Sequence, residues 1–403
     1  MRLMQEEQPG WVLLGCQAHA FALLIKDLQS EKTVRNAWSK RVYATALMMS
    51  NVIHGAEGVR AELRAIQTNI YPDGVRDVAT HCPTRFAILH MICKDLLRSE
   101  QALVQLVSSR DWAKASKDCT NADVFVAAAT LVPARGRAPA FRFFSEAALL
   151  VVLVQPIADA IHQLEADKPL LSQMRPIWAR LLAHAAAFDS NPDHAHVPPM
   201  LPLFQRRFEE HRVKEWPTAY LLDPINAVED DGEWFLPWGA LSALEQAAVK
   251  KCLLRMAGVA QAAAVEAEVT QLSLSALPDS MSAHLPVLTK RTPVPATATT
   301  PARQQIAATG MRTGWWKQVG RASFPIVSGI AIRLLSFHVT ACASERNWSL
   351  YGRVFTKARS RLALERGHKL VFIKGNDKLL RPPSELTEED VMLSLFDDTA
   401  GAI

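Results

Sequence analysis

The residues of this chain that could do chemistry gather near its C-terminus, in a short stretch that begins at Ser344. The one carboxylate at its centre is Glu345. The cationic and aromatic side chains that surround or follow it are Arg346, Trp348, Lys357, Arg359 and Arg361. Converging carboxylates that hold two divalent ions catalyse phosphoryl transfer, and one carboxylate cannot do so alone, because Mg²⁺ keeps its waters and binds a single ligand weakly. Glu345 is therefore either one member of a larger set or a solvated residue on a helix surface.

Positive charge is concentrated in the same part of the chain. Residues 346–381 hold ten lysines and arginines against Glu365 and Asp377, a net charge of +8, whereas the whole chain carries +5. A field of this kind suits a polyanion such as nucleic acid. A solvated helix face would give the same composition.

Cys16 and His19 form a second pair whose spacing could bind a metal. Three residues apart on a helix, they would share a face and supply half of a tetrahedral zinc site. The sequence offers no second pair of ligands. A packed helix whose histidine is hydrogen-bonded explains the pair without a metal.

The 344–362 block resembles the C-terminal signature of hAT-family DNA transposases, an ERNWS segment followed by a TKxRxRL pattern. The resemblance implies that Glu345 is the last of three metal-binding carboxylates. Residues 16–27 resemble the CxxH block of the same family, which begins here with Cys16. In that block His19 would be a neighbour of the active site and not a metal ligand.

Pro83-Thr84-Arg85-Phe86 resembles the entry to the family's helical insertion, where an arginine and an aromatic residue contact DNA near the cleavage point. Arginine binds phosphate through two parallel hydrogen bonds, and a base stacked on an aromatic ring gains about 1–3 kcal/mol. The resemblance therefore assigns nucleic-acid contacts to Arg85 and Phe86, as well as to the basic residues near Trp348. The alternative is that Phe86 is the first core residue of the next helix.

Two further segments resemble structural landmarks of the family, in the family's order. They are Trp216–Pro224, which we interpret as a corner containing Asp223, and Trp315-Trp316, which we interpret as core anchors. Tryptophans of this kind are more often buried in a core than placed in a site.

The resemblance implies a ribonuclease H-like α/β core interrupted by a large all-α insertion. In the family, two aspartates lie on strands before the CxxH block, and a zinc finger lies further upstream. Neither precedes Cys16 here, so we expect an incomplete core, truncated at its N-terminus, that does not cleave DNA as given. No cofactor is then expected, whereas intact family members use Mg or Mn.

Composition predicts a well-cored helical protein. Apolar residues make up 49% of the chain, charged residues 21%, and glycine is scarce at 17 copies, which favours helices. Six cysteines without paired spacing indicate a reducing compartment, and the resemblance implies the nucleus. The longest apolar run, Ala147–Val154, is far shorter than the roughly 20 residues that span a bilayer, so we expect no membrane.

The predicted fold class is mainly α. Helical spacing over 140–164 is expected to be interrupted at Pro156, because proline removes a hydrogen bond, and the proline-rich stretch at 275–310 predicts a flexible linker. The predicted divisions are a core remnant at 1–30, a helical insertion at 31–274, the linker at 275–310, an hAT C-terminal dimerisation region at 311–381 and an acidic tail at 382–403.

Two functions remain open from the sequence. The first is a transposase-derived protein that dimerises with a second copy or a related transposase chain and retains nucleic-acid binding. The second is a fragment of an active metal-dependent DNA transposase whose N-terminal aspartates and zinc finger are missing from this sequence. A third, simpler possibility is that the basic run alone binds a polyanion such as DNA.

Overall fold

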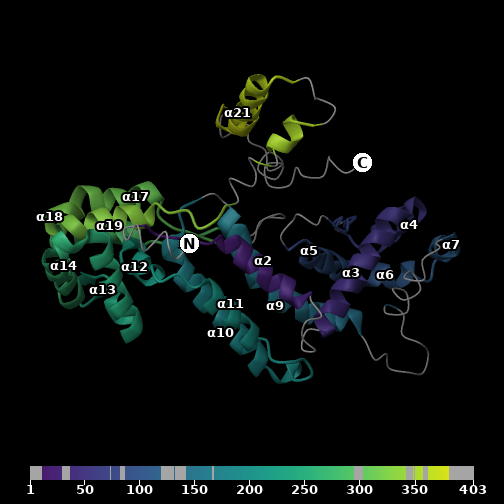
Figure 1. Ribbon diagram of the computed structural model, residues 1–403. Helices are drawn as coiled ribbons and strands as arrows, with labels where there is room; N and C mark the ends of the chain where they lie inside the picture. Colours follow the sequence, from purple (N-terminus) through teal and green to yellow (C-terminus); the bar gives the residue numbers. More distant parts are fainter. Residues whose placement is uncertain are drawn as a thin grey trace. The chain divides into compact units, whose positions relative to one another are not determined.

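The structure is a computed structural model that describes residues 11–29, 37–72, 74–81, 87–118, 131, 142–165, 168–294, 303–341, 348, 350–356 and 362–380. The chain divides into two compact units, Met1–Val339 and Thr340–Ile403. It is mainly α-helical, as its composition predicts (Figure 1).

The N-terminal part of the first unit is a group of helices around one long apolar helix, α9. Its members are α2 (Gln17–Leu28), α3 (Ala37–Gly55), α4 (Glu57–Ile70), α5 (Ile88–Arg98), α6 (Glu100–Leu106), α7 (Arg110–Asp118) and α9 (Phe143–Glu165). By length and composition α9 could cross a membrane. In the fold it packs against α2, α3 and α5, and its side chains at Leu150, Leu153, Val154 and Ile157 are buried among them.

The predicted interruption at Pro156 is wrong, because α9 runs without a break from Phe143 to Glu165. Proline leaves the carbonyl four residues earlier, that of Val152, without its helical N–H donor. The ring of His184, which comes from a different helix, fills the gap, with Nε2 3.1 Å from the Val152 oxygen. A donor from outside the helix therefore lets it continue through the proline.

The next elements lead to the other end of the first unit. They are η2 (Leu171–Gln173), α10 (Met174–Ser190), η3 (Pro192–His194), α11 (Leu201–His211), α12 (Trp216–Leu221), η4 (Pro224–Asn226), η5 (Trp238–Ala240), α13 (Ala243–Ala257), η6 (Val259–Gln261) and α14 (Ala262–Leu274). Helix α11 is fixed to α2 by Asp27, whose carboxylate accepts hydrogen bonds from Arg206 (2.8 Å) and Arg207 (2.6 and 2.7 Å). Helix α13 begins with a capping box in which Ser242 and Glu245 bond to each other's backbone N–H.

The segment predicted as a linker contains short packed elements. These are α15 (Asp279–Ser282), α16 (Leu285–Leu288), β3 (Thr292–Val294) and β4 (Arg303–Gln305). Met281, Leu285 and Leu288 are buried, and the N–H of Leu277 donates to Trp234 O at 2.7 Å. The structured parts of 275–310 thus differ from a flexible linker, because apolar residues recur between the prolines and pack onto the unit. Residues 295–302 lie outside what the structure describes.

The strands form two small antiparallel ribbons. In one, β1 (Val228–Asp230) pairs with β2 (Glu233–Phe235), with Val228 opposite Phe235; in the other, β3 pairs with β4, with Thr292 opposite Gln305. Residues 11–16 have no regular structure. No parallel strand pair occurs in the part of the chain with assigned structure, and the ribonuclease H-like core stays a prediction.

The last elements of the first unit form one group. They are α17 (Thr309–Trp315), the π-helix η7 (Trp316–Gly320), α18 (Arg321–Ser323) and α19 (Pro325–Leu335). Figure 1 shows α17, α18 and α19 beside α12 and α14. Pro325 is the first residue of α19, as its sequence position predicts. In the second unit, residues 350–354 are helical, and α21 (Leu364–Leu380) follows.

Burial of His90 in the helical core makes stability depend on pH. Its Nε2 lies 3.1 Å from Gln155 Oε1, and burial lowers its pKa from 6.5 to about 4, with Lys94 adding to the effect and Gln155 opposing it. The unfolded chain therefore takes up this proton first on acidification. Stability should fall as the pH drops from the unfolded pKa towards the folded one, by up to about 3 kcal/mol from this group.

His90→Gln removes the titration but keeps a donor for Gln155. We expect the free energy of unfolding to fall less in this variant than in the native chain between about pH 7 and about pH 4. Urea unfolding followed by circular dichroism at several pH values measures the difference. Parallel curves for the two proteins would show that His90 does not titrate in this window.

Candidate functional site

Most of the predicted site residues lie outside the part of the chain that the structure describes. They are Arg85, Phe86, Glu345, Arg346, Lys357, Arg359 and Arg361. Their assigned roles stay predictions. Cys16 and His19 are described in the first unit, and Trp348 in the second.

Cys16 and His19 stand at the start of α2. Cys16 is the half-buried residue that precedes the helix, and its carbonyl accepts the first hydrogen bond, from Ala20 N at 3.1 Å. The side chain of His19 is exposed. Among the residues with assigned positions, no group of three or more His, Cys, Asp or Glu side chains could hold a metal ion. The half zinc site considered from the spacing gains no further ligands from them.

Gln17, between these two residues, ties α2 to the end of the first unit. Its N–H donates to Val339 O at 2.8 Å, and its side-chain oxygen accepts from Trp178 Nε1 at 3.3 Å. Val339 is six residues before Glu345. The CxxH block therefore lies beside the backbone that leads towards the predicted carboxylate.

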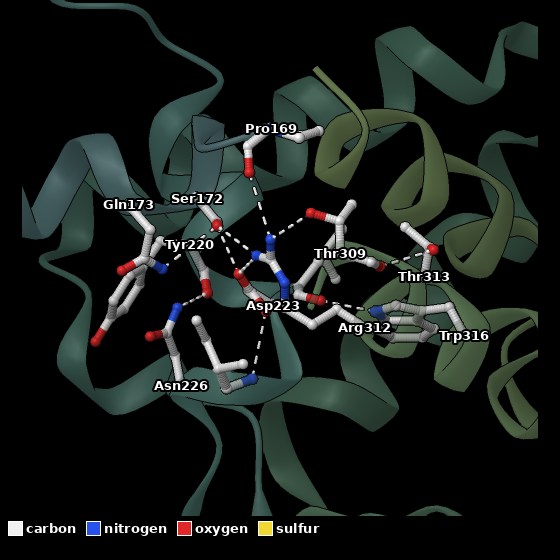
Figure 2. A network of polar contacts seen from close by, with 12 residues as sticks. Pro169, Ser172, Gln173, Tyr220, Asp223, Asn226, Thr309, Arg312, Thr313 and Trp316 are labelled. Carbon is white, nitrogen blue, oxygen red and sulfur yellow. Dashed lines mark hydrogen bonds and ion pairs between the residues drawn. The ribbon is translucent and has the colours of Figure 1, made fainter. Parts of the chain in front are cut away.

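A buried ion pair anchors the first turn of α17. Arg312 and Asp223 are 2% and 0% exposed, and Arg312 Nη1 donates to Asp223 Oδ2 at 2.6 Å. Ser172 Oγ donates to the same carboxylate oxygen at 2.5 Å. Arg312 Nη2 donates to Thr309 Oγ1 (3.0 Å) and to Pro169 O (3.3 Å) (Figure 2).

This network holds three parts of the first unit at one point, namely η2 with the residues just before it, the corner at Asp223, and α17. Asp223 also caps η4, because its second oxygen accepts from Ile225 N at 3.3 Å. Removing a guanidinium and a carboxylate from water costs several kcal/mol for each ion, and the cost is offset only where the geometry is close and further hydrogen bonds satisfy both groups. The contacts in Figure 2 meet that condition for the carboxylate and for both terminal nitrogens of the guanidinium.

Trp315 and Trp316 anchor the next turn, as the sequence predicts. Trp316 is completely buried, and its Nε1 donates to Leu222 O at 2.7 Å; Trp315 Nε1 donates to Met281 O at 3.0 Å. Trp316 begins η7, and a π-turn of this kind inserts an extra residue into a helix and is frequent at functional sites. Both indoles thus satisfy backbone carbonyls at the ends of short elements while filling the core.

Glu268 fixes the start of α19 from a neighbouring helix. Its two carboxylate oxygens accept hydrogen bonds from Ile326 N at 3.1 Å and Val327 N at 2.8 Å. These are N–H groups that a helix leaves without internal partners, and a negative charge there also complements the helix dipole. Helix α19 is therefore held at its first turn by α14.

The second unit is built around a small aromatic cluster. The hydroxyl of Tyr351 and Nε2 of His368 are hydrogen-bonded at 2.7 Å, and the Tyr351 ring stacks on Phe355 with 4.4 Å between centroids. The Phe355 ring lies directly over Gly367, at a distance that leaves no room for a β-carbon. Glycine at this position lets α21 and the preceding helical turn approach closely.

Several apolar side chains of the second unit face solvent. Trp348 and Phe372 are each 72% exposed, Leu364 is 61% exposed and Ile373 is 57% exposed. Three of these lie on α21, which spans 17 residues. Single exposed apolar residues are common on protein surfaces, but several on one short helix indicate a contact surface.

One known family matches the part of the chain that contains these elements. Residues 312–376 match the hAT family C-terminal dimerisation region. The match agrees with the resemblance of the 344–362 block to the same family. It begins at the buried Arg312 and contains both tryptophans, α19 and the first thirteen residues of α21. Comparison with curated proteins gave no match.

The sequence analysis missed the pairing of Arg312 with Asp223. It placed Asp223 in a structural corner, which the cap on η4 confirms, but assigned no partner to it. Arg312 carried no signal beyond its position just before Trp315. A single arginine among apolar and small residues at the start of a helix is the only hint that it is buried.

Removing the charge of only one member of the Arg312–Asp223 pair should lower the free energy of unfolding far more than removing both charges. Arg312→Met leaves the Asp223 carboxylate buried without its counter-ion, and we expect a loss of about 3–5 kcal/mol in the free energy of unfolding. The double variant Arg312→Met with Asp223→Asn should recover much of it, because the remaining amide is neutral. Denaturant unfolding of the native chain, of the single variants Arg312→Met and Asp223→Asn, and of the double variant gives the coupling energy.

Arg175→Met is the matched control, because its pair with Glu245 (2.6 Å) is about one-quarter exposed on each side. It should cost about 1 kcal/mol, as is usual for pairs in contact with water. Equal losses for Arg312→Met and Arg175→Met would contradict the anchoring role of the buried pair.

Proposed function

We propose that this protein self-associates through residues 312–376, and that α21 supplies the main contact. The observation that carries the proposal is the coincidence of two findings on one segment. Residues 312–376 match a dimerisation region, and α21, which lies in this segment and in the second unit, exposes apolar side chains. The partner is a second copy of this chain or a related transposase chain.

The physical basis is the cost of leaving these side chains in water. Burying apolar surface yields about 25 cal/mol per Å², and a fully buried Phe or Ile gains about 1.5–3 kcal/mol relative to its exposed state. Phe372 and Ile373 gain less than half of this within the second unit, because more than half of each is exposed. Association recovers the gain without any change in the fold.

The anchored first half of the segment supports the same function. The Arg312 pair, the two indoles and the Glu268 cap hold α17 to α19 firmly on the first unit. An association surface needs a rigid support, since ordering loose elements on binding costs free energy. Elements α17 to α19 are therefore already ordered before a partner binds them.

Phe372→Glu should weaken self-association about tenfold or more, because it places a charge at the centre of the proposed contact. Size-exclusion chromatography with light scattering over a range of concentrations gives the dissociation constant. Leu244→Glu is the matched control: Leu244 is 85% exposed on α13, outside the matched segment. Circular dichroism checks that both variants keep their helices.

A monomeric native chain at high micromolar concentration would overturn the proposal. Equal dissociation constants for Phe372→Glu and the native chain would show that the chain associates through a different surface.

Nucleic-acid binding by the basic C-terminal run is a second candidate function, which the charge of residues 346–381 favours. Within the second unit, Arg353, Arg366 and Lys374 are exposed, and so is Trp348. Exposed cations and exposed aromatic rings are the groups that make backbone and stacking contacts with single strands. We propose the nucleus as the site of action on the same grounds.

Binding of this kind should depend steeply on salt. Each phosphate contact contributes about −0.9 to the slope of log K against log salt for duplex DNA, so Arg366→Ala with Lys374→Ala should reduce the slope by about 2. Fluorescence anisotropy of a labelled duplex at several salt concentrations measures it. Lys251→Ala with Lys290→Ala, both exposed in the first unit, should leave the slope unchanged.

A further inference from the structure

An apolar groove lies between α16 and the turn from α17 to η7, within the first unit. Its volume is about 400 Å³, and it is open to solvent along one side. Helix α16 and the residues before it contribute Val287 and His284, and α17 contributes Met311. Val287 is 65% exposed and Met311 49% exposed, so the rim of the groove is apolar surface in contact with water. We call this the α16–α17 groove.

Two glycines open the α17 wall of the groove. Gly310 and Gly314 both line it, and because they are four residues apart they lie on one face of the helix. A β-carbon built at either position meets no atom within 4 Å. Glycine inside a helix costs about 0.5–1 kcal/mol relative to alanine, and no neighbour within the described part of the chain requires either one. They leave the α17 backbone open at these two positions.

The groove and the exposed face of α21 are complementary in kind. One is an apolar recess and the other an apolar helix. Val287 and Met311 of the groove, and Phe372 and Ile373 of α21, all remain about half exposed or more. Gly314, Trp315, Gln318 and Val319 of the groove belong to the same matched segment, 312–376, as Phe372 and Ile373. A helix laid in an apolar groove is a recurring mode of recognition.

We propose that the α16–α17 groove of one copy receives α21 of a second copy, with Phe372 and Ile373 as the inserted side chains. This inference rests on the proposed self-association and specifies its contact. Each copy carries both a groove and a helix. The proposal places two copies on a two-fold axis, so that each groove takes the other copy's α21 and the assembly closes as a dimer.

The size of the groove favours this reciprocal arrangement. Stable interfaces bury more than about 1,000 Å² in total, and one recess that accepts two side chains is too small to reach it. Two such contacts double the area, and each adds the flanking surface of α21, which is about 25 Å long from its 17 residues. The reciprocal dimer therefore explains how a modest groove can hold two chains together.

Photo-crosslinking identifies the contact directly. A chain with Phe372→p-benzoylphenylalanine is mixed with an isotope-labelled native chain, irradiated and digested, and the crosslinked peptides are read by mass spectrometry. We expect mixed light–heavy crosslinks from position 372 to residues 283–288 or 310–319. The same photoreactive residue at Leu244 is the control and should not reach these peptides. Crosslinks to other regions, or to the groove within a single light chain only, would overturn the inference.

Gly314→Leu tests the groove from the other side. Leucine is the better helix former, so the melting temperature should be unchanged or raised, while the side chain fills the recess and weakens dimerisation about tenfold. Gly58→Leu is the matched control, because Gly58 is also a helical glycine with open space around its β-position. It should leave the dissociation constant unchanged.

The two variants separate this inference from the proposed function. If Phe372→Glu dissociates the chain and Gly314→Leu does not, self-association stands and the groove is not the contact. If both dissociate it and Gly58→Leu does not, the groove assignment holds. A native chain that never associates overturns both.

Discussion

The pairing of Arg312 with Asp223 is the interaction on which the arrangement of the C-terminal part of the first unit depends. It joins residues 89 positions apart, in a core from which water is excluded. A buried charge must find its counter-ion, since an unpaired one costs several kcal/mol. The requirement fixes α17 against η4 and η2 more strictly than apolar contacts do, because apolar contacts are non-directional and tolerate small shifts. The two indoles that follow, Trp315 and Trp316, can then reach their carbonyl acceptors.

The segment that matches the dimerisation region is divided between two environments. Up to Val339 it belongs to the first unit, and its side chains enter the core or bond to it; from Thr340 it belongs to the second unit, where α21 keeps apolar side chains in solvent. The matched segment therefore combines an anchored half with an exposed half. In the proposed association, α17 to α19 lose little entropy because they are already ordered, and α21 supplies apolar surface that can be buried.

Much of the fold could be predicted from local signals, whereas its long-range contacts could not. Helix content, Pro325 at the start of α19 and the anchoring tryptophans follow from residue type and spacing. The continuity of α9 could not be predicted in this way, because it depends on His184 from another helix. The pairing of Arg312 could not be predicted either, because periodicity identifies which face of a helix is buried but not the residue that it meets. The prolines of 277–288 predicted a flexible linker, whereas the leucines between them pack onto the first unit. The roles of Glu345 and of Arg85 with Phe86 stay predictions, since these residues lie outside the described chain.

The contacts of Arg312, Trp316 and α19 also show that the matched segment does not contain all the partners it needs to fold alone. A fragment that began at Arg312 would carry a guanidinium without Asp223, a Trp316 without Leu222 O and an α19 without the Glu268 cap. Each of these partners lies before the segment, on elements between η2 and α14. The first half of the dimerisation region is therefore structured by the preceding helical unit. Any surface that α17 presents, including the α16–α17 groove, exists only in the context of that unit, and association through it is a property of the longer chain.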